Sequence, residues 1–176
     1  ITGLYINKTV NIPNHGLFGH IGAAGAVKNL RLSGSVVAYG SAVGGVAGLN
    51  HGAVTNCIMT GSVGSVDKAN CVGGVVGVND FAGAKVVNSA MTGSVSGTYD
   101  VGGVVGKNAN GSKVANSAMT GSVVVSANID PVGGVVGRNI GGSVVADSAM
   151  TGSVDDDNIA LAHGGVLGKN EGDAST

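Results

Sequence analysis

The sequence predicts an all-β chain wound as a parallel β-helix, a solenoid in which each turn of the chain, or coil, stacks on the one before. A block close to Val-Gly-Gly-Val-Val-Gly-x-Asn recurs every 29 or 31 residues. A second block, close to Asn-Ser-Ala-Met-Thr-Gly-Ser-Val, follows each copy and alternates apolar with polar residues. Repetition at this period indicates one structural unit stacked on itself. No stretch has the 3.6-residue period of a helix, and glycine interrupts every candidate.

The first block reads as an extended segment, in which either of the two valines could face the interior. Its final position holds an asparagine in five consecutive units: Asn50, Asn79, Asn108, Asn139 and Asn170. Asparagine tolerates the left-handed backbone of a corner, and its amide can bond to the next copy. We therefore predict an asparagine ladder at a turn. Five separate polar loop residues, or a ligand site, are the alternatives.

The second block reads as a strand with one buried face, because its residues alternate with a period of two. In the first copy, Leu30 and Leu32 alternate with Arg31 and Ser33. The same phase points four methionines inward: Met59, Met91, Met119 and Met150. It points two rows of hydroxyl side chains outward: Thr60, Thr92, Thr120 and Thr151, then Ser62, Ser94, Ser122 and Ser153.

One coil is predicted to contain three short strands and three corners. The third strand or loop falls in the variable stretch after the second block, where residues 128–131 and 155–158 read as insertions. The chain then forms a single domain of five to six coils, with repeats at about 14–42, 43–71, 72–100, 101–131 and 132–162 and a partial repeat at 163–176. We expect a right-handed solenoid, because parallel crossovers are right-handed.

Composition limits the classes of function. Glycine supplies 34 residues without the Gly-X-Y period of collagen, and only 11% of residues are charged. The formal net charge of −1 gives no field that would attract nucleic acid or an anionic membrane. The uncharged stretch from Leu32 to Val66 is interrupted by polar residues and by the repeat, so we do not expect membrane insertion.

The chain contains two cysteines, Cys57 and Cys71. They read either as two buried thiols that behave as small hydrophobes or, in a secreted protein, as a disulfide. The chain begins at Ile1, with neither an initiator methionine nor a signal peptide. We therefore expect a processed product or a piece of a longer protein.

The chain resembles the GLUG repeat of bacterial extracellular proteins. The resemblance rests on the segment Ile1–Ile6, on Gly16-Leu-Phe-Gly19 followed by Ile21, on Lys28-Asn-Leu30 with Gly34, and on the later Val-Gly-Gly-Val-x-Gly-x-Asn copies. It implies an extracellular or cell-surface bacterial setting and a passive, structural or adhesive role. It brings no catalytic residue. The later copies have valine where the family has leucine, which reads as an adjustment of volume.

No constellation of residues predicts an enzyme or a cofactor. None of His15, His20, His51 and His163 lies in a His-Glu-x-x-His motif, and no Cys/His cluster indicates a metal. A cluster of three carboxylates reads either as a solvated loop or as a weak Ca²⁺ site: Asp155, Asp156 and Asp157.

Two outward columns remain. Lys107, Arg138 and Lys169 share one position in the last three units, so they would repel one another unless carboxylates intervene. This column reads as a solvated edge that discourages aggregation or as a contact for an anion or glycan. The Thr-Gly-Ser face resembles the threonine arrays with which ice-binding solenoids order water, and ice binding is a remote alternative.

The last copy of the first block begins at Gly164, and the chain stops at Thr176 before the coil is complete. Open ends of a β-helix are edges to which another strand can add. We therefore expect a non-enzymatic rod that stacks on another copy of itself or on the remainder of a longer chain. The alternative function is an adhesin stalk that binds glycan through the variable loops.

Overall fold

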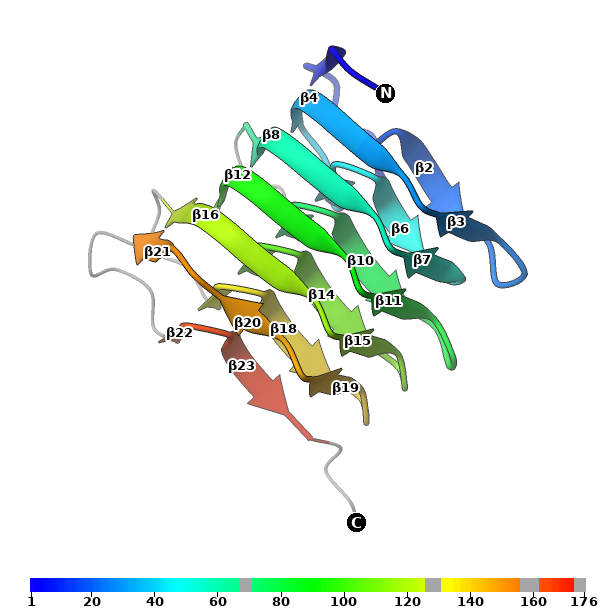
Figure 1. Ribbon diagram of the computed structural model, residues 1–176, viewed down its shortest axis with the longest axis vertical. Coiled ribbons are helices and arrows are strands. Elements are labelled where there is room, and N and C mark those ends of the chain that lie inside the picture. Colours follow the sequence, from blue (N-terminus) through cyan, green and yellow to red (C-terminus); the bar gives the residue numbers. More distant parts are fainter. Residues whose placement is uncertain (67–70, 126–130, 156–161, 173–176) are drawn as a thin grey trace.

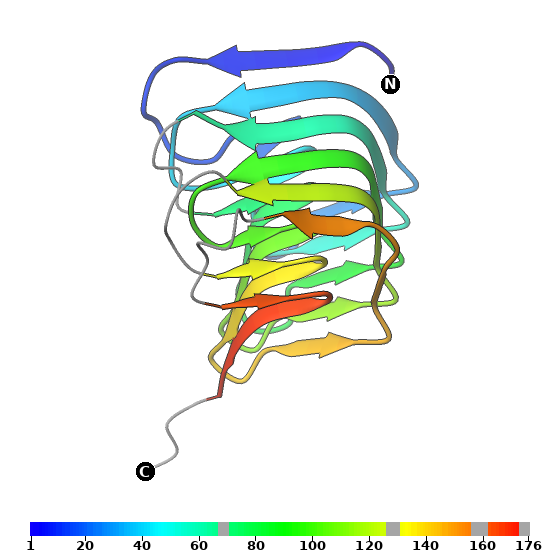
Figure 2. The same ribbon diagram turned by 90° about the vertical axis from the view of Figure 1, so that its left-hand side faces the viewer.

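The computed structural model describes residues 1–66, 71–125, 131–155 and 162–172, which form 23 strands and no helix. Every pairing between these strands is parallel and joins one coil to the next (Figure 1). Viewed from the side, the coils stack as successive layers (Figure 2). The fold is therefore a parallel β-solenoid of about five turns, as the repeat predicts. No helix in the described ranges is long and apolar enough to cross a membrane.

Each full coil contributes to four sheets, which we call A to D. Sheet C consists of β2 (Phe18–Ile21), β6 (Ala47–Asn50), β10 (Val76–Asp80), β14 (Val105–Ala109), β18 (Val136–Ile140) and β23 (Leu167–Glu171). Sheet D consists of β3 (Ala26–Lys28), β7 (Ala53–Thr55), β11 (Lys85–Val87), β15 (Lys113–Ala115) and β19 (Val144–Ala146). Sheet A consists of β1 (Leu4–Lys8), β4 (Arg31–Ala38), β8 (Ile58–Ser65), β12 (Ala90–Gly97), β16 (Ala118–Val125), β20 (Ala149–Met150) and β21 (Ser153–Asp155). Sheet B consists of β5 (Val43–Gly44), β9 (Val72–Gly73), β13 (Val101–Gly102), β17 (Val132–Gly133) and β22 (His163–Gly164).

A coil thus has four strands, not the three expected from the sequence. The first block does not form one strand, because it divides between a two-residue strand of sheet B and a longer strand of sheet C. At the corner between them, a Cβ on Gly74 would overlap the Gly103 carbonyl oxygen and the Met91 side chain. The chain turns there against the packed interior, and both valines that follow, Val75 and Val76, are fully buried.

Equivalent residues of successive coils stack in register. In sheet A, Met91 pairs with Met59 on one side and with Met119 on the other, and all three side chains are fully buried. Met150, on the last strand of the stack, is only partly buried. The interior is therefore a set of valine and methionine columns. Every further coil adds one residue to each column.

The corner between sheets D and A is built by one left-handed residue per coil. This residue is the first of the second block, and its φ lies between 47° and 57° at Asn29, Asn56, Asn88, Asn116 and Asp147. The asparagines of the first block, to which we assigned the left-handed corner, instead lie in strands of sheet C. Asparagine and aspartate tolerate this backbone because their short side chains bond locally.

A column of glycines lies between the threonine row and the serine row of sheet A. Gly34, Gly61, Gly93 and Gly121 have φ between 124° and 153°, a region that side chains rarely adopt. A Cβ on Gly93 would overlap the carbonyl oxygen of Gly61 in the preceding coil. The glycine of each Thr-Gly-Ser motif therefore permits the close approach of two backbones, which explains why it recurs.

Candidate functional site

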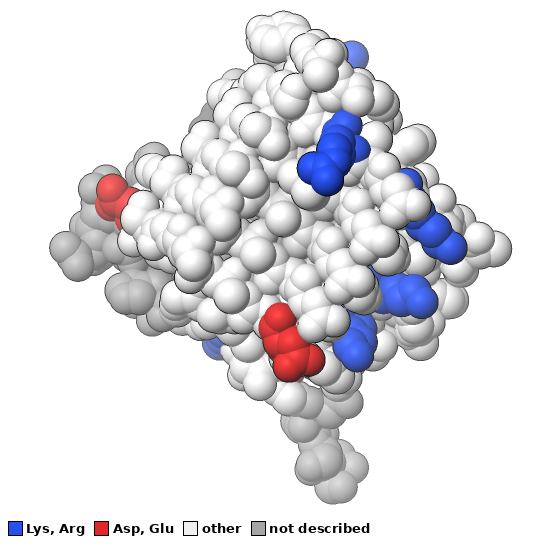
Figure 3. All heavy atoms as spheres, in the orientation of Figure 1, with Lys and Arg blue, Asp and Glu red and all other residues white. Residues whose placement is uncertain are grey.

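The hydroxyl rows predicted to face outward lie on the outer side of sheet A. Thr60, Thr92, Thr120 and Thr151 are exposed, Ser62, Ser94 and Ser122 are half-buried, and Ser153 is exposed. Some members bond along their row, as Thr120 Oγ1 does with Thr92 Oγ1 at 3.2 Å and Ser62 with Ser35 at 2.9 Å. Most of the lysine and arginine in this view lies toward the right-hand side and an acidic side chain lies low on the face, and the broad area immediately to their left carries no charge (Figure 3). The face is a regular array of hydroxyl groups.

The asparagines of the first block form a continuous ladder inside the coil. Each side-chain Nδ2 donates to the Oδ1 of the next coil, over 2.7–2.8 Å from Asn50 to Asn170. Nδ2 of Asn79 also donates to the Lys113 carbonyl, at 3.3 Å. Asn50, Asn79 and Asn108 are fully buried, so their bonds stabilise the stack and offer nothing to a ligand.

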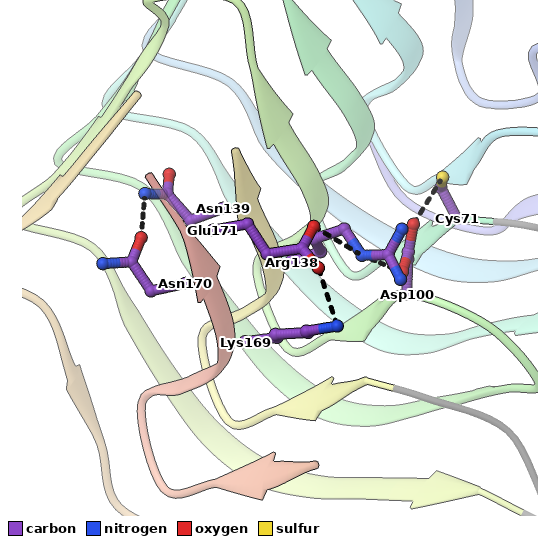
Figure 4. A network of polar contacts seen from close by, with 7 residues as sticks. All are labelled: Cys71, Asp100, Arg138, Asn139, Lys169, Asn170 and Glu171. Carbon is purple, nitrogen blue, oxygen red and sulfur yellow. Dashed lines mark hydrogen bonds and ion pairs between the residues drawn. The ribbon is translucent and has the colours of Figure 1, made fainter. Parts of the chain in front are cut away.

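The basic column stacks in register, and carboxylates do intervene (Figure 4). Arg138 pairs with Lys107 on one side and with Lys169 on the other. Glu171 Oε1 lies 2.6 Å from Lys169 Nζ, and its Oε2 lies 4.0 Å from Arg138 Nε. The hydrogen bond from Lys169 lowers the pKa of Glu171. Since this part of the column is partly exposed, each such pair contributes little to stability.

Asp100 is the buried member of this network. Its Oδ1 lies 3.2 Å from Arg138 Nε, which is itself buried and makes this charge contact without an aligned hydrogen bond. Asp100 also has a left-handed backbone, with φ of 42°. Burial raises the pKa of Asp100 to about 6, although the charges of Arg138 and Lys107 oppose the shift. A buried carboxylate that titrates near neutral pH makes the stack sensitive to pH.

Both cysteines are buried free thiols and not a disulfide. Cys71 donates to Asp100 Oδ2 at 3.6 Å, and burial together with the Asp100 charge raises its pKa far above the usual range. Cys57 contacts the carbonyl oxygens of Thr55 and Val27, and burial raises its pKa as well. Because the thiolate is the reactive form, neither cysteine is poised to act as a nucleophile.

We expect Asp100→Asn to remove a pH-dependent loss of stability. The Asp100 pKa is about 6 in the folded protein against 3.8 ordinarily, so the folded state holds the extra proton between these values. The stabilisation from this proton is complete below pH 4 and disappears as the pH rises through 6. Relative to Asp100→Asn, the wild type should therefore lose up to about 3 kcal/mol of unfolding free energy between pH 4 and pH 7.

Urea denaturation at a series of pH values measures this difference. Asp147→Asn is the matched control, because Asp147 is exposed and other coils have asparagine at its position. The difference in unfolding free energy between the wild type and this control should stay nearly constant over the pH series. A constant difference for Asp100→Asn as well would contradict the prediction.

The proposed Ca²⁺ cluster is only partly within the described residues. Asp155 is exposed at the end of β21, in register with Val124, whereas Asp156 and Asp157 lie outside the described ranges. Among the residues that the structure describes, no three His, Cys, Asp or Glu side chains are grouped closely enough to hold a metal. The insertion at residues 128–131 also lies outside them, apart from Pro131.

Sequence reasoning missed a pair of histidines that the solenoid brings together. His20 Nε2 lies 3.2 Å from His51 Nδ1, and the two rings meet edge to face with centroids 4.6 Å apart. Phe81, from the next coil, stacks on His51 at 5.5 Å. The register of Ile21 with Asn50 could have revealed the pair. His20 directly precedes Ile21, and His51 directly follows Asn50.

The two ends of the stack are open edges. Within the described residues, β1, β2 and β3 begin sheets A, C and D, while β19, β20, β22 and β23 end the four sheets. Met150 and Leu167 are partly exposed there, whereas the residues at the equivalent positions of internal coils are fully buried. Val144 and Val166 are exposed by 49% and 36%. As far as the described residues go, the ends therefore present edge strands beside incompletely buried apolar side chains.

These features define the protein as a parallel β-solenoid with an asparagine ladder inside and hydroxyl rows outside. No protein-family model matches the chain, and neither the curated proteins nor the solved structures contain a match.

Proposed function

We propose that the chain is a non-enzymatic structural solenoid of a bacterial surface or extracellular protein, in which coils stack end to end as a stiff rod. The observation that carries this proposal is the register of the sheets, in which every coil repeats the columns of the coil before it. Each edge repeats the columns that join the internal coils, so a further coil would extend them. The GLUG-like blocks support the extracellular bacterial setting.

Among the described residues, the edge strand at each end has backbone N–H groups that point away from the stack. In β19, Val144 N donates to the Ser112 carbonyl of the preceding coil. Because alternate residues of a parallel strand bond to opposite neighbours, the Val145 N–H points away from the stack. In β1, Lys8 O accepts from Tyr39 N, so by the same alternation the Asn7 N–H points outward from the other end.

Stacking would also bury apolar surface. At one end, Leu4 and Ile6 of β1 are only partly buried, and at the other Val145 and Met150 are in the same state. Joining the two ends places apolar columns against apolar columns, as in the internal coils. Because one end meets the opposite end, the contact does not close, and the product is an open filament.

Proline substitutions at the two outward N–H groups test this proposal. Proline lacks the N–H, and edge strands tolerate it. We expect filaments of the wild type in negative-stain microscopy and none for Asn7→Pro or Val145→Pro alone. An equimolar mixture of the two variants should form dimers and stop, because each supplies one intact end. Sedimentation velocity measures the dimer.

Asn7→Ala and Val145→Ala are the matched controls, because they shorten the side chains and keep both N–H groups. Both should still form filaments. Dispersed short rods of the wild type at high concentration would contradict the proposal. So would filaments of either proline variant, since growth would then not use these edges.

A further inference from the structure

We propose that His20 and His51 form a binding site for one divalent transition-metal ion of the Zn²⁺ type. This site is independent of the proposed end-to-end stacking of chains, and no sequence motif indicates it. The evidence is the distance between the two ring nitrogens, the rigidity of their supports and the charges around them.

The distance between the nitrogens suits a shared metal ion. Zn²⁺ binds imidazole nitrogen at about 2.0–2.1 Å with tetrahedral angles, which places two ligand nitrogens about 3.3 Å apart. His20 Nε2 and His51 Nδ1 are 3.2 Å apart. In their present contact one nitrogen carries a proton and donates a hydrogen bond, which the other nitrogen accepts. For both to bind metal, that proton moves to the other nitrogen of its own ring, so both imidazoles stay neutral and offer a lone pair.

The backbone holds the two rings in place. His51 N donates to the Ile21 carbonyl at 2.8 Å, which ties His51 to the residue after His20. His20 lies in β2, in register with Leu49 of β6. Phe81 stacks against the His51 ring at an interplanar angle of 29°. A pair held in this way loses little side-chain freedom on binding, which favours chelation over binding to either histidine alone.

Within its own column of sheet C, His20 has no basic residue as a near neighbour. His20 belongs to the outward column of sheet C, and its next neighbours there are Leu49 and Val78. The first basic residue of the column, Lys107, follows Val78 and is therefore three strands away from His20. Three strand spacings are about 14 Å, beyond the distance at which physiological salt screens exposed charges.

The other coordination positions would be filled by water. The Asp80 side chain accepts a hydrogen bond from Asn110, so we do not assign it to the metal. A site with two protein ligands and open positions binds metal reversibly at the surface, and transition-metal preference follows from its nitrogen ligands.

Isothermal titration of the wild type with ZnCl₂ tests the site. We expect saturable binding of one ion per chain. His20→Gln and His51→Gln should each weaken the affinity for Zn²⁺ by roughly tenfold or more, because even loss of a residue that only supports a metal ligand has an effect of this size. Circular dichroism should show that both variants keep the fold, because the His20 side chain is exposed and His51 is half-buried.

His163→Gln is the matched control, since it removes a histidine outside the pair and should leave the affinity unchanged. The ring ¹⁵N shifts of His20 and His51 should both move on adding Zn²⁺. Absence of saturable binding would overturn the proposal. Equal affinity in the wild type and in either pair variant would also overturn it, because the pair would then be only a hydrogen-bonded contact.

Discussion

Gly93→Ala is expected to lower the free energy of unfolding by about 4 kcal/mol, the largest loss we predict for a change of one methyl group. Gly93 has φ of 137°, where a residue with a side chain costs about 1–3 kcal/mol. The added Cβ would also overlap the Gly61 carbonyl oxygen, which is backbone and cannot rotate away. Forcing two coils apart adds about 1–3 kcal/mol.

Guanidinium denaturation, followed by circular dichroism, measures this loss. Gly83→Ala separates its two causes, because Gly83 has φ of 88° and its Cβ would meet nothing within 4 Å. We expect about 1 kcal/mol for this control, which is the conformational cost alone. Similar losses of unfolding free energy in the two variants would contradict this account. The close approach of coils in sheet A would then not be the reason for glycine at position 93.

Asn79→Asp is expected to destabilise the protein by about 3–5 kcal/mol at neutral pH, although it barely changes the volume. The substitution replaces the Nδ2 donor with an oxygen, which then faces Asn108 Oδ1 over the 2.8 Å of the present hydrogen bond. The position is fully buried, so a carboxylate there is desolvated and unpaired. Below the carboxyl pKa the proton can restore a donor, so part of the stability should return in acid.

Denaturation of Asn79→Asp at pH 7 and pH 4 measures both effects. The matched control is Asn56→Asp, because Asn56 Nδ2 donates to Asn29 Oδ1 at 3.1 Å in an exposed asparagine pair. Water can replace that bond, and Asp147 occupies the equivalent corner of another coil. The control should change stability by less than about 0.5 kcal/mol. Equal losses at the two positions would contradict a stabilising role for burial of the ladder.

Much of the fold follows from repetition. Because equivalent residues stack, the period-two phase at Leu30 and Leu32 carries over to Met59 and Met91 in the later copies. The same argument joins Asn79 to Asn108. It failed at corners, where periodicity ends. There the left-handed residue is Asn88 and not the ladder asparagine, and Val75 and Val76 both face inward because a turn separates sheet B from sheet C.

The sequence by itself determined the parallel solenoid, the stacking of like residues and the inward or outward side of the second block. These depend on local periodicity and on a repeat length that every coil shares. Only the tertiary structure decided the fourth strand of each coil, the burial of Asp100 beside Arg138 and the contact of His20 with His51. These depend on where corners fall and on which side chains from neighbouring coils meet around them, and a repeat of residue types does not specify that geometry.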